Sequence, residues 1–592
     1  AVVVATVLQG PPDPPTSDET SQQPARPARS RPHFEDVVEE VRLPRWIESL
    51  ALFLIAAGIY FWVGYQTVVE DGVVVFDALD RLTRAYMVWH NEPPKLAAIG
   101  FVFPPLTTMS FLPFTAVKPL ATSLVALPLV SAIFGGTMVV SMNRLFARCS
   151  MPGLRRWLMI ALFALNPLVV FYAGNGMSEV VYLALLTVSL YCFMSWFLTA
   201  QPRFLVGAAL AFSLLVLLRY SFGIWAIVIA VMMAVGLSRR GAATDEGEGT
   251  LVAFLAPLIY AVGVWLLFNW LIVGDLLGWL SSSGAFAVNA PQASAAGHLS
   301  LVDALTRGGE LTLGVFALGI LVVPALVMTA VSKRDEMSWW LSILALTGIV
   351  VIGAGALIAQ DFNVLAMRNA LPVLIVCVAG AGWLYQILPS LRTVIWLAAL
   401  VGLVLTAIGS WYAMQRYPFQ NQEQAFAHAI RSGDDQNGSN SIGGYRVGTN
   451  PEQAMAAYVN ANVRRRSTIL TDNAQTFGVI LLSGRPQLFF DRVDKGDSTF
   501  QQSVLRPYGR VTHMLMAKQA SGDLIRRRYP TAASRVVAGL TPVFETERYL
   551  LLRLAERDPR RPRGVVSTSG SGEVGGQVGG RATPATGRRA SP

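Results

Sequence analysis

Residues 73–106, VVVFDALDRLTRAYMVWHNEPPKLAAIGFVFPPL, follow the first long apolar run of the chain. They place two Asp, two Arg, one His and one Lys together before the sequence becomes apolar again. This cluster is too polar to lie among lipid tails, so it must lie at a membrane interface or in a protein-lined cavity. It is therefore the first place to look for chemistry.

The composition is that of an integral membrane protein. Of the 592 residues, 53% are hydrophobic and only 14% are charged, whereas a soluble protein carries about 25% charged residues. The net charge of +10 is concentrated in the two ends and in short loops, which indicates topology and anionic lipid more than a nucleic-acid partner. Cys149, Cys192 and Cys377 form neither a CxxC site nor a disulfide framework, which argues against redox chemistry and structural zinc.

Apolar runs between Trp46 and Tyr412 predict an α-helical polytopic membrane domain over residues 46–414. About eleven of these runs are long enough to cross a bilayer as helices. Their approximate bounds are 47–66, 120–145, 157–172, 179–199, 203–218, 221–238, 251–272, 311–331, 338–359, 367–387 and 392–412.

The charges of the loops predict the orientation of these spans. Short basic loops such as RLFARCSMPGLRR and VSKRDEMS belong in the cytoplasm by the positive-inside rule. Residues 1–45 are predicted to be a disordered cytoplasmic tail and show no convincing signal peptide. The loop 67–119 then faces outward, and an odd number of crossings places everything after Tyr412 outside.

Residues 415–557 predict a small extracytoplasmic α/β domain. The segments RRRSTILTD, RPQLFFDR, VTHMLMAK and RYLLLRLA are expected to be strands, and NPEQAMAAYVNANV and AQTFGVILLSG helices. No GxGxxG, GxxxxGK[ST] or zinc spacing is present, so no nucleotide or metal chemistry is expected of this domain. Residues 558–592 have the Gly, Ser, Pro and Arg bias of a disordered tail.

The polar cluster itself predicts a helix that begins near Asp77 and lies along the outer membrane surface. Ala78, Leu82, Ala85 and Tyr86 share one side of this helix. Tyr86, together with Trp89 and Trp279, fits an interfacial aromatic belt better than it fits sugar stacking.

Two interpretations of the charged residues stay open. In the first, Asp77 caps the helix, and Asp77/Arg81 and Asp80/Arg84 are ordinary i,i+4 ion pairs. In the second, a carboxylate acts as a general base toward a hydroxyl while nearby arginines hold a phosphate. The second pair of roles fits the transfer of a group from a lipid phosphate.

Three stretches resemble the GT-C glycosyltransferases, particularly bacterial and actinobacterial members. They are DALDRLTRAYMVWHNEPPKLAAIGFVFPPL, ALNPLVVFYAGNGMSEVVYLALL and NWLIVGDLLGWLSSSGAF. The resemblance covers about residues 47–415, and it departs from the family pattern at Asp80, where Ser is usual, at His90 and Asn91, and at Leu276, where Pro is usual.

The resemblance implies a GT-C-like fold and an inverting transfer of a sugar from a polyprenyl-phosphate donor to a hydroxyl on the outer side of the membrane. Asp77 matches the catalytic acid of the family and would accept the proton of the attacking hydroxyl. The acceptor would be a cell-wall polysaccharide, a glycolipid or a protein. The sequence is rich in Ala, Arg and Gly, which suggests a high-GC bacterium. Mannose or arabinose is then the expected sugar, and the plasma membrane is the expected location.

Other polar residues are assigned to substrate binding or to support of the site, each beside a simpler alternative. The candidate phosphate or donor ligands are Arg81, Arg84, His90, Lys95, Arg219 and Arg368, against helix ion pairs, snorkelling or solvated loops. The candidate supporting residues are Asp80, Asn175, Glu179 and Asp275, against helix capping for Glu179 and a turn for Asp275.

No cofactor is required by this interpretation. Asp77, Asp80 and Glu179 have hard oxygen ligands for a divalent cation, although spacing alone does not support a site. Two other functions remain as alternatives: a transporter or flippase of lipid-linked sugars, and a non-catalytic cell-wall scaffold. A transporter would show internal repeats and broken helices with charges near the midplane, and a scaffold would leave Asp77 without a role.

Overall fold

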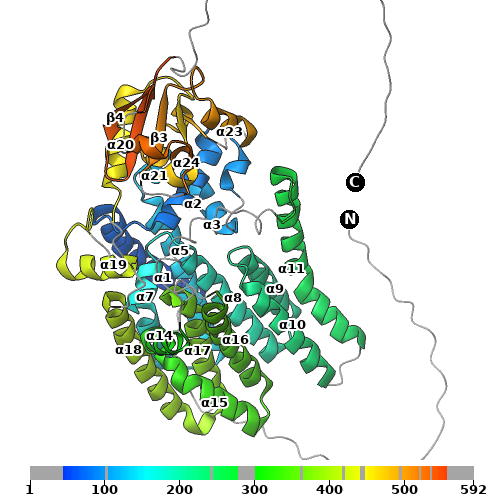
Figure 1. Cartoon of the computed structure of the whole chain (residues 1–592). Coiled ribbons are helices and arrows are strands. Elements are labelled where there is room, and N and C mark those ends of the chain that lie inside the picture. Colours follow the sequence, from blue (N-terminus) through cyan, green and yellow to red (C-terminus); the bar gives the residue numbers. More distant parts are fainter. Residues whose placement is uncertain are drawn as a thin grey trace, which may run out of the picture. The chain divides into compact units, whose positions relative to one another are not determined.

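The computed structural model describes residues 45–100, 104–239, 244–277, 300–359, 365–416, 421–439, 447–491, 497–518, 522–533 and 537–556. The described residues from Ser49 onward belong to one compact unit. The membrane helices after Glu48 and the α/β domain therefore belong to one unit (Figure 1). The predicted tails, apart from Arg45 in the first of them, lie outside the described residues.

The predicted membrane domain is a set of packed apolar helices, which confirms the helical part of the fold. A π-helix, Tyr65–Glu70, continues the first of them. The helices are α1 (Arg45–Gly64), α5 (Ala126–Arg148), α6 (Gly153–Ala164), α7 (Pro167–Tyr172), α8 (Ser178–Thr199), α9 (Pro202–Val216), α10 (Phe222–Arg239), α11 (Thr244–Val273), α14 (Leu301–Val315), α15 (Ala317–Lys333), α16 (Glu336–Ala359), α17 (Met367–Ile387) and α18 (Arg392–Arg416).

Each of the eleven predicted runs coincides with one of these helices or with a pair of them. Among the described residues, seven helices are long and apolar enough to cross a membrane, and eight if α14 and α15, bent by 92°, form one span. The run 157–172 is divided between α6 and α7 because Asn166 caps a new helix: its side chain accepts hydrogen bonds from Leu168 N and Val169 N, and Pro167 follows it.

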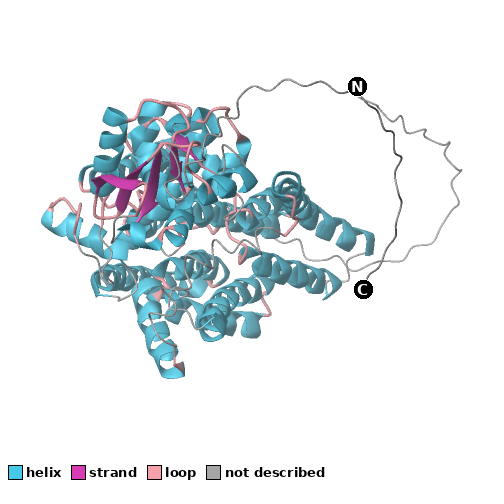
Figure 2. Cartoon of the chain, turned by 45° about the horizontal axis from the view of Figure 1, so that its top comes forward, coloured by secondary structure: helices cyan, strands magenta, loops and turns pink. Residues whose placement is uncertain are grey.

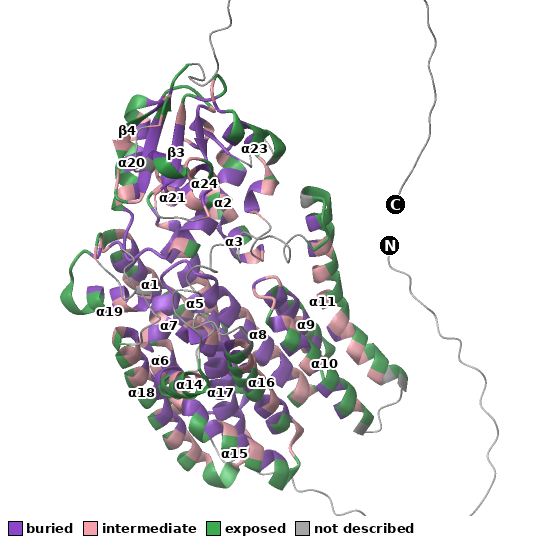
Figure 3. Cartoon of the chain, viewed as in Figure 1, coloured by how far each residue is buried: buried purple, intermediate pink, exposed green. Residues whose placement is uncertain are grey.

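Helix α17 lies in the interior of the bundle, and 89% of its most apolar stretch is buried. The side chains of α5 and α8 are also mostly buried, whereas α1, α11 and α18 leave large apolar side chains exposed (Figure 3). Exposed apolar surface on this scale is expected where lipid tails replace water as the solvent.

The predicted outer loop 67–119 is largely helical. It contains α2 (Phe76–His90), a 3₁₀ turn (Leu96–Ile99), α3 (Leu106–Thr115) and α4 (Lys118–Thr122). The helix predicted at Asp77 is present, but its apolar side does not lie on the membrane surface. Ala78, Leu82, Ala85 and Tyr86 are each 0% exposed, because α2 packs on α3, α5 and, from the C-terminal domain, α21.

The C-terminal domain is α/β, as predicted. Its five-stranded sheet has the order β2-β1-β3-β5-β4, with β1 parallel to β2 and β3, and with β5 antiparallel to β3 and β4. Figure 2 shows the sheet surrounded by helices. The strands are β1 (Ile469–Thr471), β2 (Phe489–Phe490), β3 (His513–Ala517), β4 (Leu540–Glu545) and β5 (Tyr549–Leu554), and the helices are α20 (Asn450–Asn462), α21 (Asn473–Ser483), α23 (Asp497–Leu505) and α24 (Leu524–Arg528).

This domain is attached to α2 by side chains from both partners. Thr83 Oγ1 donates to the Phe477 carbonyl at 3.4 Å, and Tyr86 Oη donates to the Gly484 carbonyl at 3.0 Å. At the C-terminal end of α2, Arg466 forms an ion pair with Glu92. The helix that carries Asp77 is therefore shared between the membrane domain and the α/β domain.

Candidate active site

Asp77 lies in the first turn of α2 and faces open space. The N-cap of α2 is Val75, whose backbone is extended and whose side chain makes no capping hydrogen bond. The interpretation of Asp77 as the N-cap is therefore wrong. The Asp77 side chain is 48% exposed, and its Oδ2 lies 3.9 Å from Arg368 Nη1. Asp77 is thus an accessible carboxylate beside a guanidinium that lies 291 positions further along the chain.

Arg368 is held at the start of α17 by its neighbours. Its carbonyl accepts a hydrogen bond of 2.7 Å from Tyr182 Oη on α8. Its side chain is 32% exposed, so the guanidinium can meet a ligand while its backbone is fixed in the bundle. A guanidinium presents several donors in one plane and suits a phosphate group.

Arg219 lies beside the same tyrosine. Its Nη2 donates to Asn369 Oδ1 at 2.5 Å, and its Cζ lies 5.2 Å from the centroid of the Tyr182 ring. Asn369 is the residue after Arg368. Tyr182 therefore contacts both Arg219 and the backbone of Arg368. Two of the predicted phosphate ligands thus lie around the same tyrosine.

Glu179 and a carboxyl group that the sequence did not single out, Glu423, also surround Arg368. Glu179, in the first turn of α8, is 2% exposed, and Glu423, in α19 (Asn421–Ser432), is 4% exposed. Arg368 interacts electrostatically with both of them and with Asp77. Glu423 accepts a hydrogen bond from Tyr172 Oη, and burial raises the pKa of its carboxyl, although that hydrogen bond opposes the shift. Glu179 therefore joins the site in addition to beginning a helix.

Asn175 lies in the turn between α7 and α8. Its Oδ1 accepts a hydrogen bond of 3.0 Å from Met177 N, while its Nδ2 is buried and has no hydrogen-bond partner among the described residues. The next residue, Gly176, has φ of +81°, and a Cβ there would lie 2.5 Å from Leu127 Cδ2. This turn fixes the start of α8 and therefore the place of Glu179.

The other charged residues of α2 lie on its buried and half-buried sides. Asp80 and Arg84 form the predicted i,i+4 ion pair, with 2.7 Å between Oδ2 and Nε. Arg81 is 8% exposed, and its Nη1 lies 3.9 Å from the sulfur of Met177. Asp80 is thus already paired within its own helix, whereas Asp77 is directed to Arg368.

His90 and Lys95 are not brought to Asp77. His90 is the last residue of α2, about 20 Å along the helix from Asp77 at 1.5 Å per residue. Its Nε2 donates to the Thr115 carbonyl at 2.9 Å, and burial lowers the pKa of its imidazole. Lys95 lies beyond that end of α2, before the 3₁₀ turn.

Asp275 is exposed after α11, and its Oδ1 accepts a hydrogen bond of 2.9 Å from Leu277 N. This is the contact expected of an Asp that begins a turn. The remainder of the loop, with Trp279, lies outside the described residues. Of the two predicted belt residues that are described, Tyr86 is buried and Trp89 is exposed.

Asp77, Asp80 and Glu179, for which the sequence alone supported no metal site, do not form a cluster in the described part of the chain. Within the part of the chain that the structure describes, no group of three or more Asp, Glu, His or Cys side chains lies close enough to hold a metal ion. A groove of about 420 Å³ between α14, α15 and α18 is lined by apolar residues and by Tyr412. Its lining includes none of the candidate site residues.

No family model and no curated protein matches the sequence. Among solved structures, the chain is similar to ArnT from Cupriavidus metallidurans bound to undecaprenyl phosphate, with a TM-score of 0.48 and 10% identity over 86% of this chain and 98% of that one. It is also similar to the oligosaccharyltransferase AglB from Archaeoglobus fulgidus in complex with an inhibitory peptide and a dolichol-phosphate, with a TM-score of 0.41 and 13% identity over 81% and 72% of the two chains. At these identities the similarities give no residue-by-residue correspondence. These are similarities of overall fold, and they assign no activity, substrate or site residue to this chain.

Proposed function

We propose that the chain is a membrane glycosyltransferase that transfers a sugar from a polyprenyl-phosphate donor to a hydroxyl acceptor, with Asp77 as the general base. The observation that carries the proposal is the pairing of an exposed carboxylate, Asp77, with the guanidinium of Arg368 at 3.9 Å. A base and a cation at this separation can serve one reaction in which a proton is removed and a phosphate departs.

The reaction is a single displacement at the anomeric carbon. The acceptor oxygen forms a bond to that carbon while its proton passes to the Asp77 carboxylate. The bond from the anomeric carbon to the phosphate oxygen breaks, and the polyprenyl phosphate leaves with the electron pair. Because attack occurs on the face opposite the departing phosphate, the configuration at the anomeric carbon inverts.

The cations of the site are assigned to the leaving group. Arg368 stabilises the negative charge that develops on the departing phosphate, and Arg219, supported on Tyr182, adds a second positive charge nearby. Glu179 and Glu423 hold Arg368 electrostatically. This arrangement fixes the position of the guanidinium before the donor arrives.

The reaction is placed on the outer side of the plasma membrane of a bacterium. The short basic loops favour a cytoplasmic N-terminus, so that α2, the start of α17 and the α/β domain face outward. The solved neighbours bind undecaprenyl phosphate or dolichol-phosphate, and a polyprenyl-phosphate sugar is the donor class proposed for this chain. Mannose and arabinose are the first sugars to test, with a glycan, a glycolipid or a protein as the acceptor.

One feature favours the transporter as a second candidate. If α14 and α15, bent by 92°, form one span, that span is broken in the way of the transporter helices that form binding sites. The residues at the bend, Val315, Phe316 and Ala317, are all apolar. A substrate with a phosphate would find no charged partner among these three residues.

A reconstituted assay separates these functions and tests the base. Proteoliposomes receive a radiolabelled polyprenyl-phosphate sugar and a membrane acceptor, and both transfer and sugar-lipid movement across the bilayer are measured. We expect Asp77→Asn to lower kcat by roughly 10²- to 10⁴-fold, with donor binding and folding retained. Asp80→Asn, on the same helix but paired with Arg84, is the matched control and should have a smaller effect.

Three outcomes would contradict the proposal. Equal losses in the two variants would show that the base is misassigned. Transfer that survives Asp77→Asn would remove the base from the mechanism. Movement of the sugar-lipid without any transfer would assign the chain to the transporters.

A further inference from the structure

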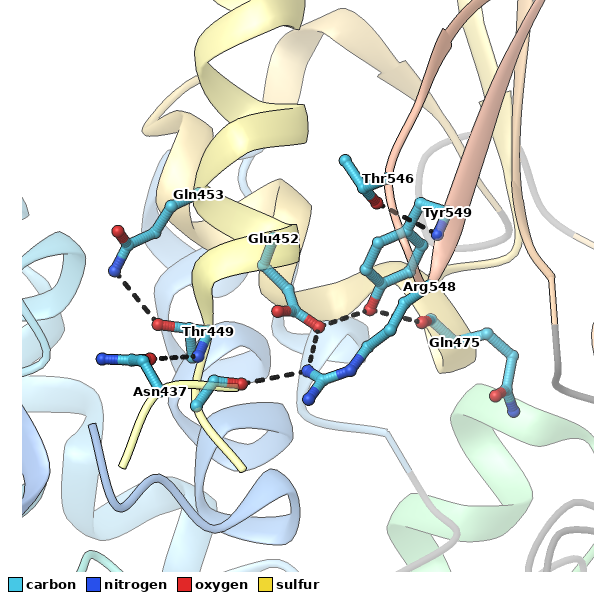
Figure 4. Close-up of polar contacts among 9 residues, drawn as sticks. Asn437, Thr449, Glu452, Gln453, Gln475, Thr546, Arg548 and Tyr549 are labelled. Carbon is cyan, nitrogen blue, oxygen red and sulfur yellow. Dashed lines mark hydrogen bonds and ion pairs between the residues drawn. The ribbon is translucent and has the colours of Figure 1, made fainter. Parts of the chain in front are cut away.

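A buried ion pair in the α/β domain lies next to the first turn of α2. Glu452 on α20 is 0% exposed. Its Oε1 accepts hydrogen bonds from Arg548 Nη1 at 2.8 Å and from Tyr549 Oη at 2.9 Å. Arg548 Nη1 also donates to the Gly448 carbonyl at 3.0 Å. Figure 4 shows Arg548 and Tyr549 converging on the Glu452 carboxylate.

The pair fixes the place of the Arg548 side chain. A carboxylate removed from water needs a charged partner and hydrogen bonds, since an unpaired buried charge is strongly destabilising. Glu452 receives both from the β4–β5 hairpin, in which Arg548 and Tyr549 are neighbours, and the Arg548 carbonyl in turn accepts a hydrogen bond from Lys518 N at 2.8 Å. Arg548 is therefore held at its guanidinium by Glu452 and at its backbone by Lys518, the residue that follows β3.

The guanidinium of Arg548 lies over the ring of Phe76, the residue that precedes Asp77. Arg548 Cζ lies 4.7 Å from the centroid of the Phe76 ring. The same ring makes an edge-to-face contact with the ring of Phe477 on α21, with 6.4 Å between the centroids. Phe76 is the first residue of α2, so cation–π and aromatic contacts from the α/β domain act on the turn that carries Asp77.

The junction leaves little room for α2 to shift. A Cβ added at Gly478 of α21 would lie 2.8 Å from Glu452 Cγ and 3.2 Å from Leu79 Cδ2. Helices α2, α20 and α21 therefore pack closely against one another at Leu79, about one turn after Phe76 in α2. Because Val75 makes no side-chain capping hydrogen bond, the first turn of α2 depends on such contacts to remain ordered.

We propose that Arg548 is a positioning residue for the reaction: held by Glu452, it stacks on Phe76 and fixes the first turn of α2, from which Asp77 faces Arg368. The inference rests on the proposed function, because Asp77 is the group positioned. It makes the α/β domain a part of the active site. A base that is displaced by about 1 Å can lose up to a hundredfold in rate, so a contact one residue away is enough to control kcat.

The variants are chosen to leave Glu452 paired. Arg548→Lys keeps the positive charge beside Glu452 but removes the planar group that lies over Phe76. Phe76→Leu removes the ring and leaves the ion pair intact. We expect each to lower kcat by between about tenfold and a hundredfold while the donor KM stays within about twofold of wild type. Phe76→Tyr, which keeps the aromatic face, should restore most of kcat.

The link between the two residues is tested by their double variant. If Arg548 acts through Phe76, Arg548→Lys combined with Phe76→Leu should lower kcat no further than either change alone. Arg466→Lys is the matched control. It makes the same substitution in another ion pair between this domain and the α2 region, the pair with Glu92 at the far end of α2, and should leave kcat unchanged.

A second readout does not depend on activity. Hydrogen–deuterium exchange of the peptide that covers residues 74–80 should become faster in Arg548→Lys and in Phe76→Leu, and should be unchanged in Arg466→Lys. Unchanged exchange and unchanged kcat in Arg548→Lys would overturn the inference, as would a loss of kcat no larger than that of Arg466→Lys.

Failure of the inference is distinguishable from failure of the proposed function. If wild type transfers sugar and Asp77→Asn does not, but Arg548→Lys retains full kcat, only the positioning role is lost. If wild type makes no transfer, or if transfer survives Asp77→Asn, the proposed function fails, and the exchange measurement still reports whether Arg548 orders the first turn of α2.

Discussion

Three carboxyl groups interact with Arg368, and they differ in their access to water. Asp77 is 48% exposed, whereas Glu179 and Glu423 are buried. A group that exchanges a proton with a substrate must be reachable, whereas a group that holds a guanidinium in place is most effective when it is shielded from solvent. The difference in exposure therefore separates the proposed base from its two neighbours.

We expect the buried Glu423 to make stability depend on pH. Because burial raises the pKa of its carboxyl, the contribution of the neutral form to stability is fully present below the unfolded pKa and is lost as pH rises through the folded pKa. We expect Glu423→Gln, which keeps an acceptor for Tyr172, to remove this dependence. Thermal unfolding of the purified protein is measured at pH 4.5 and at pH 7.5. The fall in Tm from the lower to the higher pH should be smaller in Glu423→Gln than in wild type. A larger loss in the variant would contradict this assignment.

At the residue scale, the sequence predicted Asp77 as the base, which stays a prediction, and it did not reveal that Arg368 lies beside Asp77. Arg219 and Arg368 were two of six possible phosphate ligands, and spacing does not reveal which side chains turn inward. Glu423 gave no signal, because an acidic residue in the first turn of a helix is ordinary. The contacts that distinguish these residues join positions that are hundreds of residues apart, such as Tyr172 with Glu423.

At the scale of elements, the close approach of α1 to the turn before α8 makes a test. A Cβ at Gly64 would lie 2.5 Å from the Gly174 carbonyl oxygen, and backbone atoms cannot move away cheaply. We expect Gly64→Ala to lower the stability of the folded protein by about 1 to 3 kcal/mol, measured as a lower Tm in detergent. Gly58→Ala, in the same helix with nothing within 4 Å of the added Cβ, is the control and should cause no loss.

The elements themselves were largely predictable because apolar runs of membrane length leave few alternatives. The strand that the sequence prediction missed is β4, whose residues LTPVFE contain Pro542. Proline is tolerated there because β4 lies at the edge of the described sheet, beside β5. The surface position of α2 was wrong because an amphipathic pattern does not tell lipid from protein as the partner of its apolar side.

At the scale of the whole molecule, the proposed orientation can be measured directly. Alkaline phosphatase is active only when it is exported, so a fusion after residue 556 should be active. A fusion after Arg334, between α15 and α16, should be inactive, whereas a green fluorescent protein at that position should fluoresce. The opposite result would place Asp77 and the α/β domain in the cytoplasm and would exclude the proposed outer reaction.

The attachment of the α/β domain to α2 has a consequence for how the protein is made. Thr83 contacts Phe477, a residue 394 positions later in the chain. At a synthesis rate of 5 to 20 residues per second, α2 waits roughly 20 to 80 s for the helix that covers it. During that interval its apolar side must be shielded by the translocation machinery or by lipid. If synthesis stops before α21, the inserted chain has an α2 without the helix that covers it. We therefore expect the first turn of α2 to become ordered only after translation is complete.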